Sequence, residues 1–413
     1  MYRPWLKWFS RTCIGTVKSD LIFEEVGQSQ TPNIFPPSEP DFMNSPTSAS
    51  ENTSQGRPAG GRPSATGSPF GSRPGSAPVS EPANFVEVQS QSRVPYDCVF
   101  LMAYGAPECM EDVRPFLDNV LRGLPVPKER YEAVVHHYEL IGGKSPLNEL
   151  TERQAKGLRE ELAQQKIDLP VFVGMRFYKP YMFTALRAMK DAGCRRAIGI
   201  ILSPYQSIPS WEKYMETIQE ILDLGYASEV PSVDFIKPWF DHPLFAKSQA
   251  AQVQTALNQI PADRRAKAKI VFTAHSIPTR VAAMCPYVQQ IEHASKAVAN
   301  ELGYEDWVLV WQSRSGDPKT PWLEPDVNEY LPTLKQQGVQ DVVLCPIGFI
   351  SDHVEVMYDL DLEAKATCEQ AGLNMVRAET VNDHPVFIQA LADIVKTRME
   401  KDRKTQSNVF IRP

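Results

Sequence analysis

The sequence has no excess of basic residues and no long hydrophobic run. Its 413 residues include 43 Lys and Arg against 50 Asp and Glu, which gives a net charge of −7. A protein whose main partner is nucleic acid needs a basic face, so this balance argues against such a partner. No window holds about 18 uncharged apolar residues, so no transmembrane helix is expected. The apolar content of 42 % still suffices for a sizeable core.

Cysteine is also sparse and lacks a pattern. None of the seven cysteines forms a Cys-x-x-Cys pair, and no Cys/His spacing is typical of a zinc site. An odd, scattered set predicts reduced thiols and therefore a cytoplasmic protein rather than a disulfide framework. Cys98, Cys194 and Cys345 lie in or beside apolar runs, so we expect them to be small core residues.

The first part of the chain differs in composition from the rest. Residues 44–82, "NSPTSASENTSQGRPAGGRPSATGSPFGSRPGSAPVSEP", are almost entirely Ser, Pro, Gly, Thr and Ala. Such a segment cannot bury enough apolar surface to offset the entropy lost on ordering. The leading "MYRPWLKWFSRTCIGTVK" has no continuous apolar core and is a poor secretory signal. We therefore predict a disordered, low-complexity extension over residues 1–95.

A truncated chain that starts near Asn84 should keep the activity and the thermal stability of the full chain. The reason is the Ser/Pro/Gly-rich composition of residues 44–82, which offers few apolar side chains to a packed core. Turnover and Tm of the two chains, measured side by side, check this expectation. A large loss of either would mean that the extension is part of the fold.

From residue 96 onward, apolar runs rich in β-branched residues alternate with amphipathic segments, the pattern of a parallel α/β fold. The expected strands are 96–104, 171–177, 197–205, 233–239, 269–277, 307–313, 342–349 and 375–380. The expected helices include 148–165, 211–224, 244–259, 285–302 and 386–400. Four strands followed by four more predict two similar doubly wound domains, over 96–262 and 263–385.

Polar residues collect where several expected strands end. They are Tyr104, Tyr205, His275, Gln312, Ser313 and the run from Ser351. Doubly wound sheets bind ligands beyond the carboxyl ends of their strands. A site between the two domains is therefore predicted.

The segment "DHVEVMYDLDLEAKAT", read as a helix over 352–367, carries an unusual number of acids. Glu355, Asp359 and Glu363 are four residues apart and share one face. This acidic ladder borders an apolar face, whereas Asp361 and Lys365 should point into water. The apolar face consists of Val356, Met357, Leu360 and Ala364. A bound or passing metal ion would compensate the like charges; a solvated acidic face is the alternative, and Asp352 with Glu355 also fits a capping box.

His275 ends the apolar run "KIVFTAHSIP" and belongs to the same half of the chain as Glu355. At a strand end it is either a structural residue with satisfied hydrogen bonds or a functional one. A neutral imidazole can accept a proton near pH 7 or bind a borderline metal such as Fe²⁺. Since both residues follow strands of one domain, they could face each other across a cleft.

Five segments resemble the ferrochelatase family, whose members insert ferrous iron into a porphyrin. They are "YELIGGKSPL", "SPYQS", "AHSIP", "WQSRSGDPKTPWLEPD" and "PIGFISDHVEVMYDLD", and the resemblance covers about residues 96–400. It implies the chelatase fold, with two Rossmann-like doubly wound domains of parallel four-stranded sheets, and a C-terminal helix over 386–400 that packs on the first domain. It also implies that His275 and Glu355 are catalytic and bind metal, with Asp359 and Glu363 on the path of the metal.

Further positions bear on which porphyrin is used. Tyr104, Tyr138 and Ser145 resemble porphyrin-contacting residues of the coproporphyrin III ferrochelatases of Gram-positive bacteria. Other expected porphyrin contacts depart from that pattern. Leu121 and Arg122 stand where two arginines are usual, and His137 stands where one arginine is usual. Tyr205 replaces a histidine, and Phe240 replaces a tyrosine. We therefore expect coproporphyrin III as the substrate, with protoporphyrin IX as the alternative.

The resemblance also sets expectations about cofactors and partners. Porphyrin and Fe²⁺ are substrates, so no permanently bound cofactor is expected. No cysteine follows Cys368, so the C-terminal iron–sulfur cluster of some relatives should be absent. The segment 116–140 lacks the apolar patch of membrane-docked forms, and a monomer is expected. Alternatives are a tetrapyrrole chelatase for Co²⁺ or Ni²⁺ and a non-catalytic haem or porphyrin carrier.

Overall fold

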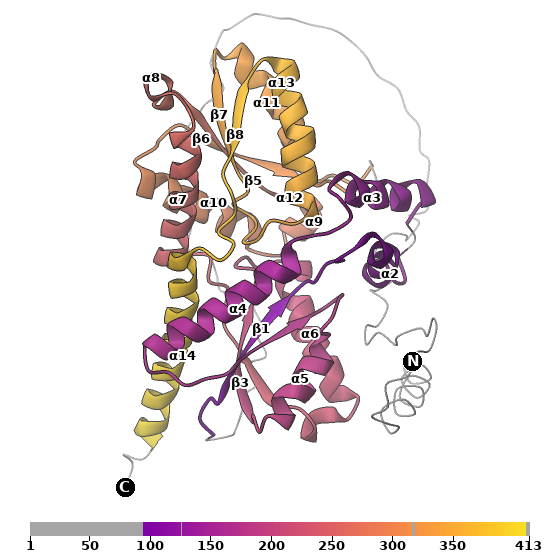
Figure 1. Cartoon of the computed structure of the whole chain (residues 1–413), viewed down its shortest axis with the longest axis vertical. Helices are drawn as coiled ribbons and strands as arrows, with labels where there is room; N and C mark the ends of the chain where they lie inside the picture. Colours follow the sequence, from indigo (N-terminus) through magenta and orange to yellow (C-terminus); the bar gives the residue numbers. More distant parts are fainter. Residues whose placement is uncertain (1–93, 125, 316–318, 410–413) are drawn as a thin grey trace, which may run out of the picture.

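A computed structural model describes residues 94–124, 126–315 and 319–409, with side chains up to residue 403. Almost all of the expected N-terminal extension lies outside the described residues. The described chain forms two lobes stacked along the long axis, each built on one parallel sheet (Figure 1). Within these residues, no helix is long and apolar enough to cross a membrane.

Both sheets are four-stranded and have the same strand order. The first has the order β2-β1-β3-β4 and the second the order β6-β5-β7-β8. The first sheet consists of β1 (Cys98–Ala103), β2 (Val171–Met175), β3 (Arg196–Ile201) and β4 (Ser232–Phe235). The second consists of β5 (Lys269–His275), β6 (Trp307–Gln312), β7 (Asp341–Cys345) and β8 (Asn374–Arg377). All eight predicted strands are present, and every pairing is parallel.

The central strands are mostly apolar, and β1 is apolar throughout, because helices cover both faces of each sheet. All six residues of β1 are buried, and successive side chains belong to different cores. Val99 and Leu101 join the large core that extends through both lobes, whereas Phe100 and Met102 join a smaller core on the opposite face. A strand buried on both faces cannot show the alternation of apolar and polar residues that marks a half-exposed strand.

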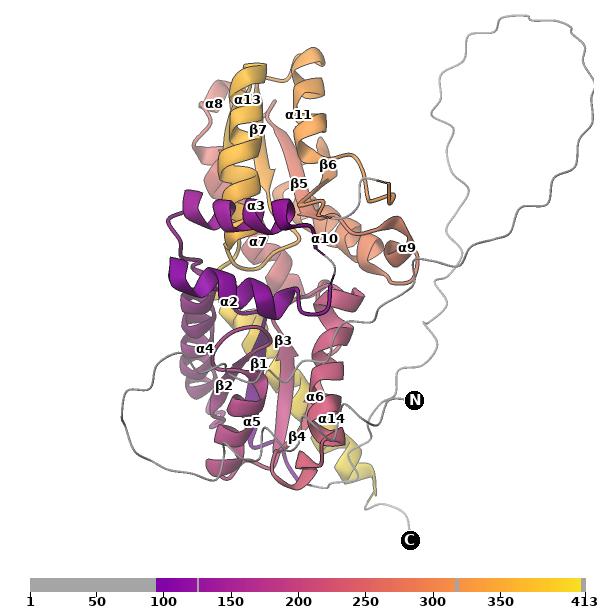
Figure 2. The same cartoon turned by 90° about the vertical axis from the view of Figure 1, so that its right-hand side faces the viewer.

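Helices connect the strands and cover the sheets. Those of the first lobe are α2 (Met110–Val120), α3 (Lys128–Leu140), α4 (Leu147–Gln164), α5 (Met182–Asp191) and α6 (Lys213–Asp223). The later ones are α7 (Pro243–Asn258), α8 (Ala262–Arg265), α9 (Thr279–Ala282), α10 (Tyr287–Leu302), α11 (Val327–Gln336), α12 (Val354–Tyr358), α13 (Lys365–Ala371) and α14 (Pro385–Val409). In Figure 2, α2 and α3 lie across the junction between the two lobes.

The C-terminal helix α14 packs along the first lobe, beside α4 and α7 (Figure 1). A buried polar network holds it there. The Arg398 Nε donates to the Tyr96 hydroxyl at 2.8 Å, and that hydroxyl donates to Asp234 at 2.8 Å. Arg196 pairs with Asp234 at 2.6 Å and with Asp402 of α14 at 3.1 Å. One guanidinium therefore joins β3, β4 and the C-terminal helix.

Replacing Arg196 by Ala should destabilise the protein strongly. Its side chain is 7 % exposed and Asp234 is 9 % exposed, so the substitution leaves a buried carboxylate without this partner. Breaking a buried ion pair from one side typically costs about 3–5 kcal/mol. Chemical denaturation checks this, with the exposed Arg114→Ala as the control, because that residue pairs with Glu132 at the surface. Equal effects of the two substitutions would contradict the expectation.

Candidate active site

His275 is the last residue of β5, and its ring is fixed by the residue that follows it. The Nδ1 atom contacts the carbonyl oxygen of Ser276, and the Tyr287 hydroxyl donates to the carbonyl oxygen of His275 at 3.1 Å. A carbonyl oxygen can only accept, so Nδ1 carries the proton in this contact. The other ring nitrogen, Nε2, then has a free lone pair when the imidazole is neutral.

The free nitrogen of His275 faces a carboxylate. The Nε2 atom lies 3.7 Å from Oε1 of Glu355, and the two side chains are 29 % and 41 % exposed. A lone pair and a carboxylate oxygen repel each other unless a proton or a metal ion lies between them. The pair is accessible from solvent and is therefore placed to share a cation or to take up a proton.

Glu355 is in the first turn of α12, and the start of that helix differs from the sequence expectation. The predicted capping box of Asp352 and Glu355 is wrong. The N-cap is His353, whose Nδ1 accepts from the backbone N–H of Glu355 at 3.2 Å. Burial lowers the pKa of His353, which keeps this nitrogen available as an acceptor.

Asp352 does not cap the helix but forms an ion pair with Arg377, the last residue of β8. The NH1 of Arg377 lies 3.1 Å from Oδ1 of Asp352, and its Nε lies 2.5 Å from Oδ1 of Asp361. The expectation that Asp361 points freely into water is therefore wrong. The arginine ties two acids of the acidic segment to the second sheet. Neither of them belongs to the acidic ladder of Glu355, Asp359 and Glu363.

The acidic segment is not one continuous α-helix as predicted. A π-helix over Asp359–Ala364 separates α12 from α13. Val356, Leu360 and Ala364 are fully buried, as expected of the apolar face, and Met357 is half-buried. The periodicity of the sequence does not reveal the wider turn. Tertiary contacts accompany it, since Asp359 bonds to Ser313 while Asp361 bonds to Arg377. Such π-turns are rare and occur often at functional sites.

Asp359 lies one turn beyond Glu355 and is held from β6. The hydroxyl of Ser313 donates to its Oδ2, and Gln312 donates to the carbonyl oxygen of Glu355 at 3.0 Å. Burial, with the charges of Glu355 and Glu363, raises the pKa of Asp359 to about 7. Ionising this carboxyl group is therefore costly in its surroundings, and an incoming cation would offset that cost.

The charge of Glu355 acts across both lobes. Together with desolvation, it raises the pKa of Tyr104, Tyr138 and Tyr287. Tyr104 directly follows β1 and is 38 % exposed, with its ring 4.6 Å from that of Phe177. The ends of β1 and β5 thus bring a tyrosine of the first domain and the His–Glu pair of the second into one region.

The remaining predicted porphyrin contacts differ in accessibility. Tyr138 and Ser145 are 2 % and 1 % exposed. Tyr205 is 1 % exposed and donates to the carbonyl oxygen of Ile347 at 2.8 Å, so it joins the two lobes within the core. Phe240 is half-buried against His293, and Arg122 donates to Asn119 at 3.1 Å. Their roles toward a ligand stay predictions.

His137 makes a contact that the sequence did not indicate. Its ring stacks on Tyr358 of α12, with centroids 3.6 Å apart and planes 11° apart. Desolvation and nearby Arg130 lower the pKa of His137 to about 4, so the ring is neutral at physiological pH. The stack joins α3 of the first domain to the helix that carries Glu355. The sequence analysis missed several residues near the site, among them Tyr358 and Arg377. A basic residue at a strand end opposite an acidic helix was the available signal for Arg377.

The fold and site define a class: a protein of two Rossmann-like domains with a solvent-accessible His–carboxylate pair at the ends of parallel strands. The ferrochelatase family model matches residues 96–399. The chain is 40 % identical over 306 residues to the coproporphyrin III ferrochelatase of Mycolicibacterium smegmatis, covering 73 % of this chain and 89 % of that protein. For the coproporphyrin III ferrochelatase of Streptomyces griseus, the identity is 42 % over 326 residues, covering 75 % and 87 %.

A protein named simply ferrochelatase, from Rhodopirellula baltica, is 39 % identical over 309 residues and covers 74 % of this chain and 87 % of its own length. Among solved structures, SirB from Bacillus subtilis with Fe³⁺ gives a TM-score of 0.46 at 11 % identity, covering 73 % of this chain and 94 % of that one. The family model and the three relatives of about 40 % identity show that the chain belongs to the ferrochelatase family. It is an enzyme of haem biosynthesis that inserts iron into a porphyrin.

Proposed function

We propose that this enzyme inserts Fe²⁺ into coproporphyrin III and that His275 and Glu355 carry out the insertion. The observation that carries this proposal is the distance of 3.7 Å between His275 Nε2 and Glu355 Oε1, with Tyr104 at the end of the facing domain's central strand. Two relatives of about 40 % identity bear the name of coproporphyrin III ferrochelatase, which favours that porphyrin over protoporphyrin IX.

Insertion requires two events at one face of the ring: loss of water from Fe²⁺ and removal of two pyrrole N–H protons. The His275 imidazole, with its Nδ1–H held by Ser276, presents Nε2 as a base or as a nitrogen ligand for a borderline cation. Glu355 stabilises the imidazolium that forms when Nε2 takes a proton. The pair thus acts as the proton acceptor and as the last ligand of the metal before transfer.

Asp359 and Glu363 lead toward this pair along the acidic segment. Carboxylates bind a divalent ion of borderline hardness weakly enough to release it. Asp359, with its pKa raised to about 7, exchanges a proton for an incoming ion at little electrostatic cost. Asp352 and Asp361 are already paired with Arg377, which weakens their competition for the ion. This separation of acids leaves one path for iron.

The test is an anaerobic assay of Fe²⁺ with coproporphyrin III and with protoporphyrin IX in parallel, followed by the visible spectrum of the product. A higher kcat/KM with coproporphyrin III is expected. A preference for protoporphyrin IX would overturn the assignment of the substrate but not that of the family. Parallel assays with Co²⁺ and Ni²⁺ establish whether iron is the preferred metal.

A further inference from the structure

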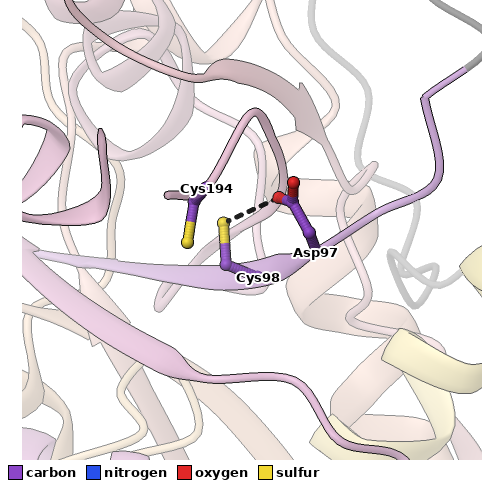
Figure 3. A group of neighbouring side chains, drawn as sticks. All are labelled: Asp97, Cys98 and Cys194. Atoms are coloured by element: carbon purple, nitrogen blue, oxygen red, sulfur yellow. Dashed lines mark hydrogen bonds between the residues drawn. The ribbon is translucent and has the colours of Figure 1, made fainter. Parts of the chain in front are cut away.

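A second group of metal-ligating side chains lies at the amino ends of the strands of the first sheet, away from the proposed active site. Asp97 precedes β1, Cys98 begins it, and Cys194 precedes β3 (Figure 3). Their ligand atoms all lie within 4.8 Å of one another. The opposite end of β1, where Tyr104 lies, is about 20 Å away at roughly 3.3 Å per residue. Nothing in the iron-insertion chemistry uses these three residues.

We propose that Asp97, Cys98 and Cys194 form a binding site for a thiophilic divalent cation such as Zn²⁺ or Cd²⁺. Spacing rules do not detect it, because the two cysteines come from different strands. Parallel pairing of β1 with β3 sets Cys98 beside Ala197, and Cys194 lies in the turn that leads into β3. The pairing therefore brings the two thiols together at one edge of the sheet.

The distances match those of a tetrahedral site. Bonds of about 2.3 Å to sulfur and 2.0 Å to oxygen place two sulfurs about 3.8 Å apart and a sulfur and an oxygen about 3.5 Å apart. The Cys98 Sγ lies 3.6 Å from Oδ1 of Asp97, and no pair of ligand atoms exceeds 4.8 Å. Binding therefore needs shifts of about an ångström at most, leaving one position for water.

The carboxylate is oriented before any metal binds. Oδ1 of Asp97 accepts from the backbone N–H of Arg196 at 3.0 Å, and Oδ2 accepts from that of Arg195 at 2.9 Å. Each carboxylate oxygen retains a second lone pair. The Asp97 side chain is 28 % exposed, whereas Cys98 and Cys194 are 0 % and 4 % exposed. A cation can therefore enter past the carboxylate and be held by the two buried sulfurs.

The charges also balance. Each thiol releases its proton to solvent as its sulfur–metal bond forms, because the thiolate is the ligand. Two thiolates, one carboxylate and a divalent cation leave about one negative charge. The Nε of Arg195 lies 3.7 Å from Oδ2 of Asp97 and supplies a positive charge beside it. Soft sulfur ligands select Zn²⁺ or Cd²⁺, whereas the nitrogen and oxygen ligands of His275 and Glu355 suit Fe²⁺.

The test uses the reduced full-length chain with Cd²⁺ as the probe, followed by the ultraviolet sulfur-to-cadmium charge-transfer band and by a shift in Tm. A band that saturates at one Cd²⁺ per chain is expected. Cys98→Ala and Cys194→Ala should each lose the band and weaken binding at least about 100-fold, since even second-shell changes cost 10–100-fold. Cys368→Ala is the matched control, because Cys368 is fully buried in the second domain and belongs to no such cluster among the described residues.

Two results would overturn the proposal: a wild-type chain that gives no thiolate band at saturating Cd²⁺, or a band that persists in Cys98→Ala. Iron insertion by the alanine variants should equal that of the wild type, so the outcome is independent of the active-site assignment. If a variant fails to fold, Asp97→Asn is measured instead. It should keep the sulfur band but bind Cd²⁺ more weakly, and unchanged affinity would contradict the proposed third ligand.

Discussion

Replacing His275 by Ala is expected to abolish iron insertion while porphyrin binding survives. The imidazole presents Nε2 to Glu355 at 3.7 Å, where it handles a proton or the metal and not the periphery of the macrocycle. Removing a general base typically costs 10²–10⁴-fold in rate, so kcat should fall at least about 100-fold. The porphyrin Kd, measured by absorbance titration, should change little, because the other predicted porphyrin contacts lie on other elements.

His136→Ala is the control for this experiment. His136 is an exposed histidine of α3 that pairs with Glu139, and its side chain is 60 % exposed. It should leave turnover unchanged. Substantial turnover in His275→Ala would instead show that His275 has a structural role at the end of β5. A Tm for each variant separates loss of chemistry from loss of fold.

The sequence predicted the architecture well because its strands are buried on both faces. An uninterrupted apolar run such as that of β1 reports burial directly, and the parallel order follows from the helices between the strands. The sequence also predicted which face of the acidic helix is buried, since Val356, Leu360 and Ala364 are fully buried. Each of these inferences depends only on the pattern of residues along the chain.

Contacts between distant elements could not be predicted in this way. The wide π-turn at Asp359 accompanies bonds to Ser313 and Arg377, which belong to two other strands or strand ends. Likewise, the stack of His137 on Tyr358 depends on how α3 of one domain meets α12 of the other. The pairing of Asp361 with Arg377 is the most consequential case, because an acid that was expected to be free in solvent has a cationic partner.

Along the acidic ladder, we expect a graded effect of neutralising each acid. Glu355→Gln should lower kcat as strongly as His275→Ala, since the two groups act as a pair. Asp359→Asn and Glu363→Gln should raise the KM for Fe²⁺ more than they lower kcat, because they hold the ion before the chemical step. Steady-state kinetics at varied Fe²⁺ with saturating porphyrin separate the two parameters.

Asp359→Asn should also stabilise the protein in a pH-dependent way. Its folded pKa of about 7 lies above the ordinary value of 3.8, so ionising Asp359 destabilises the folded state as pH rises from about 4 to 7. Asparagine removes that cost while still accepting from Ser313. The Tm of Asp359→Asn should therefore exceed that of the wild type at pH 8 and match it near pH 4.

The control must be an acid of the same segment that is exposed and outside the ladder. Asp361 does not serve, because Asp361→Asn would break its pair with Arg377 and disturb the π-helix. Glu369 of α13 is exposed and lies beyond the π-helix, so Glu369→Gln changes the net charge equally. It should leave both the KM for Fe²⁺ and the pH dependence of Tm unchanged. If Glu369→Gln raised the KM as much as Asp359→Asn, the acids would act only through their summed charge, and no defined path for iron would exist along this face.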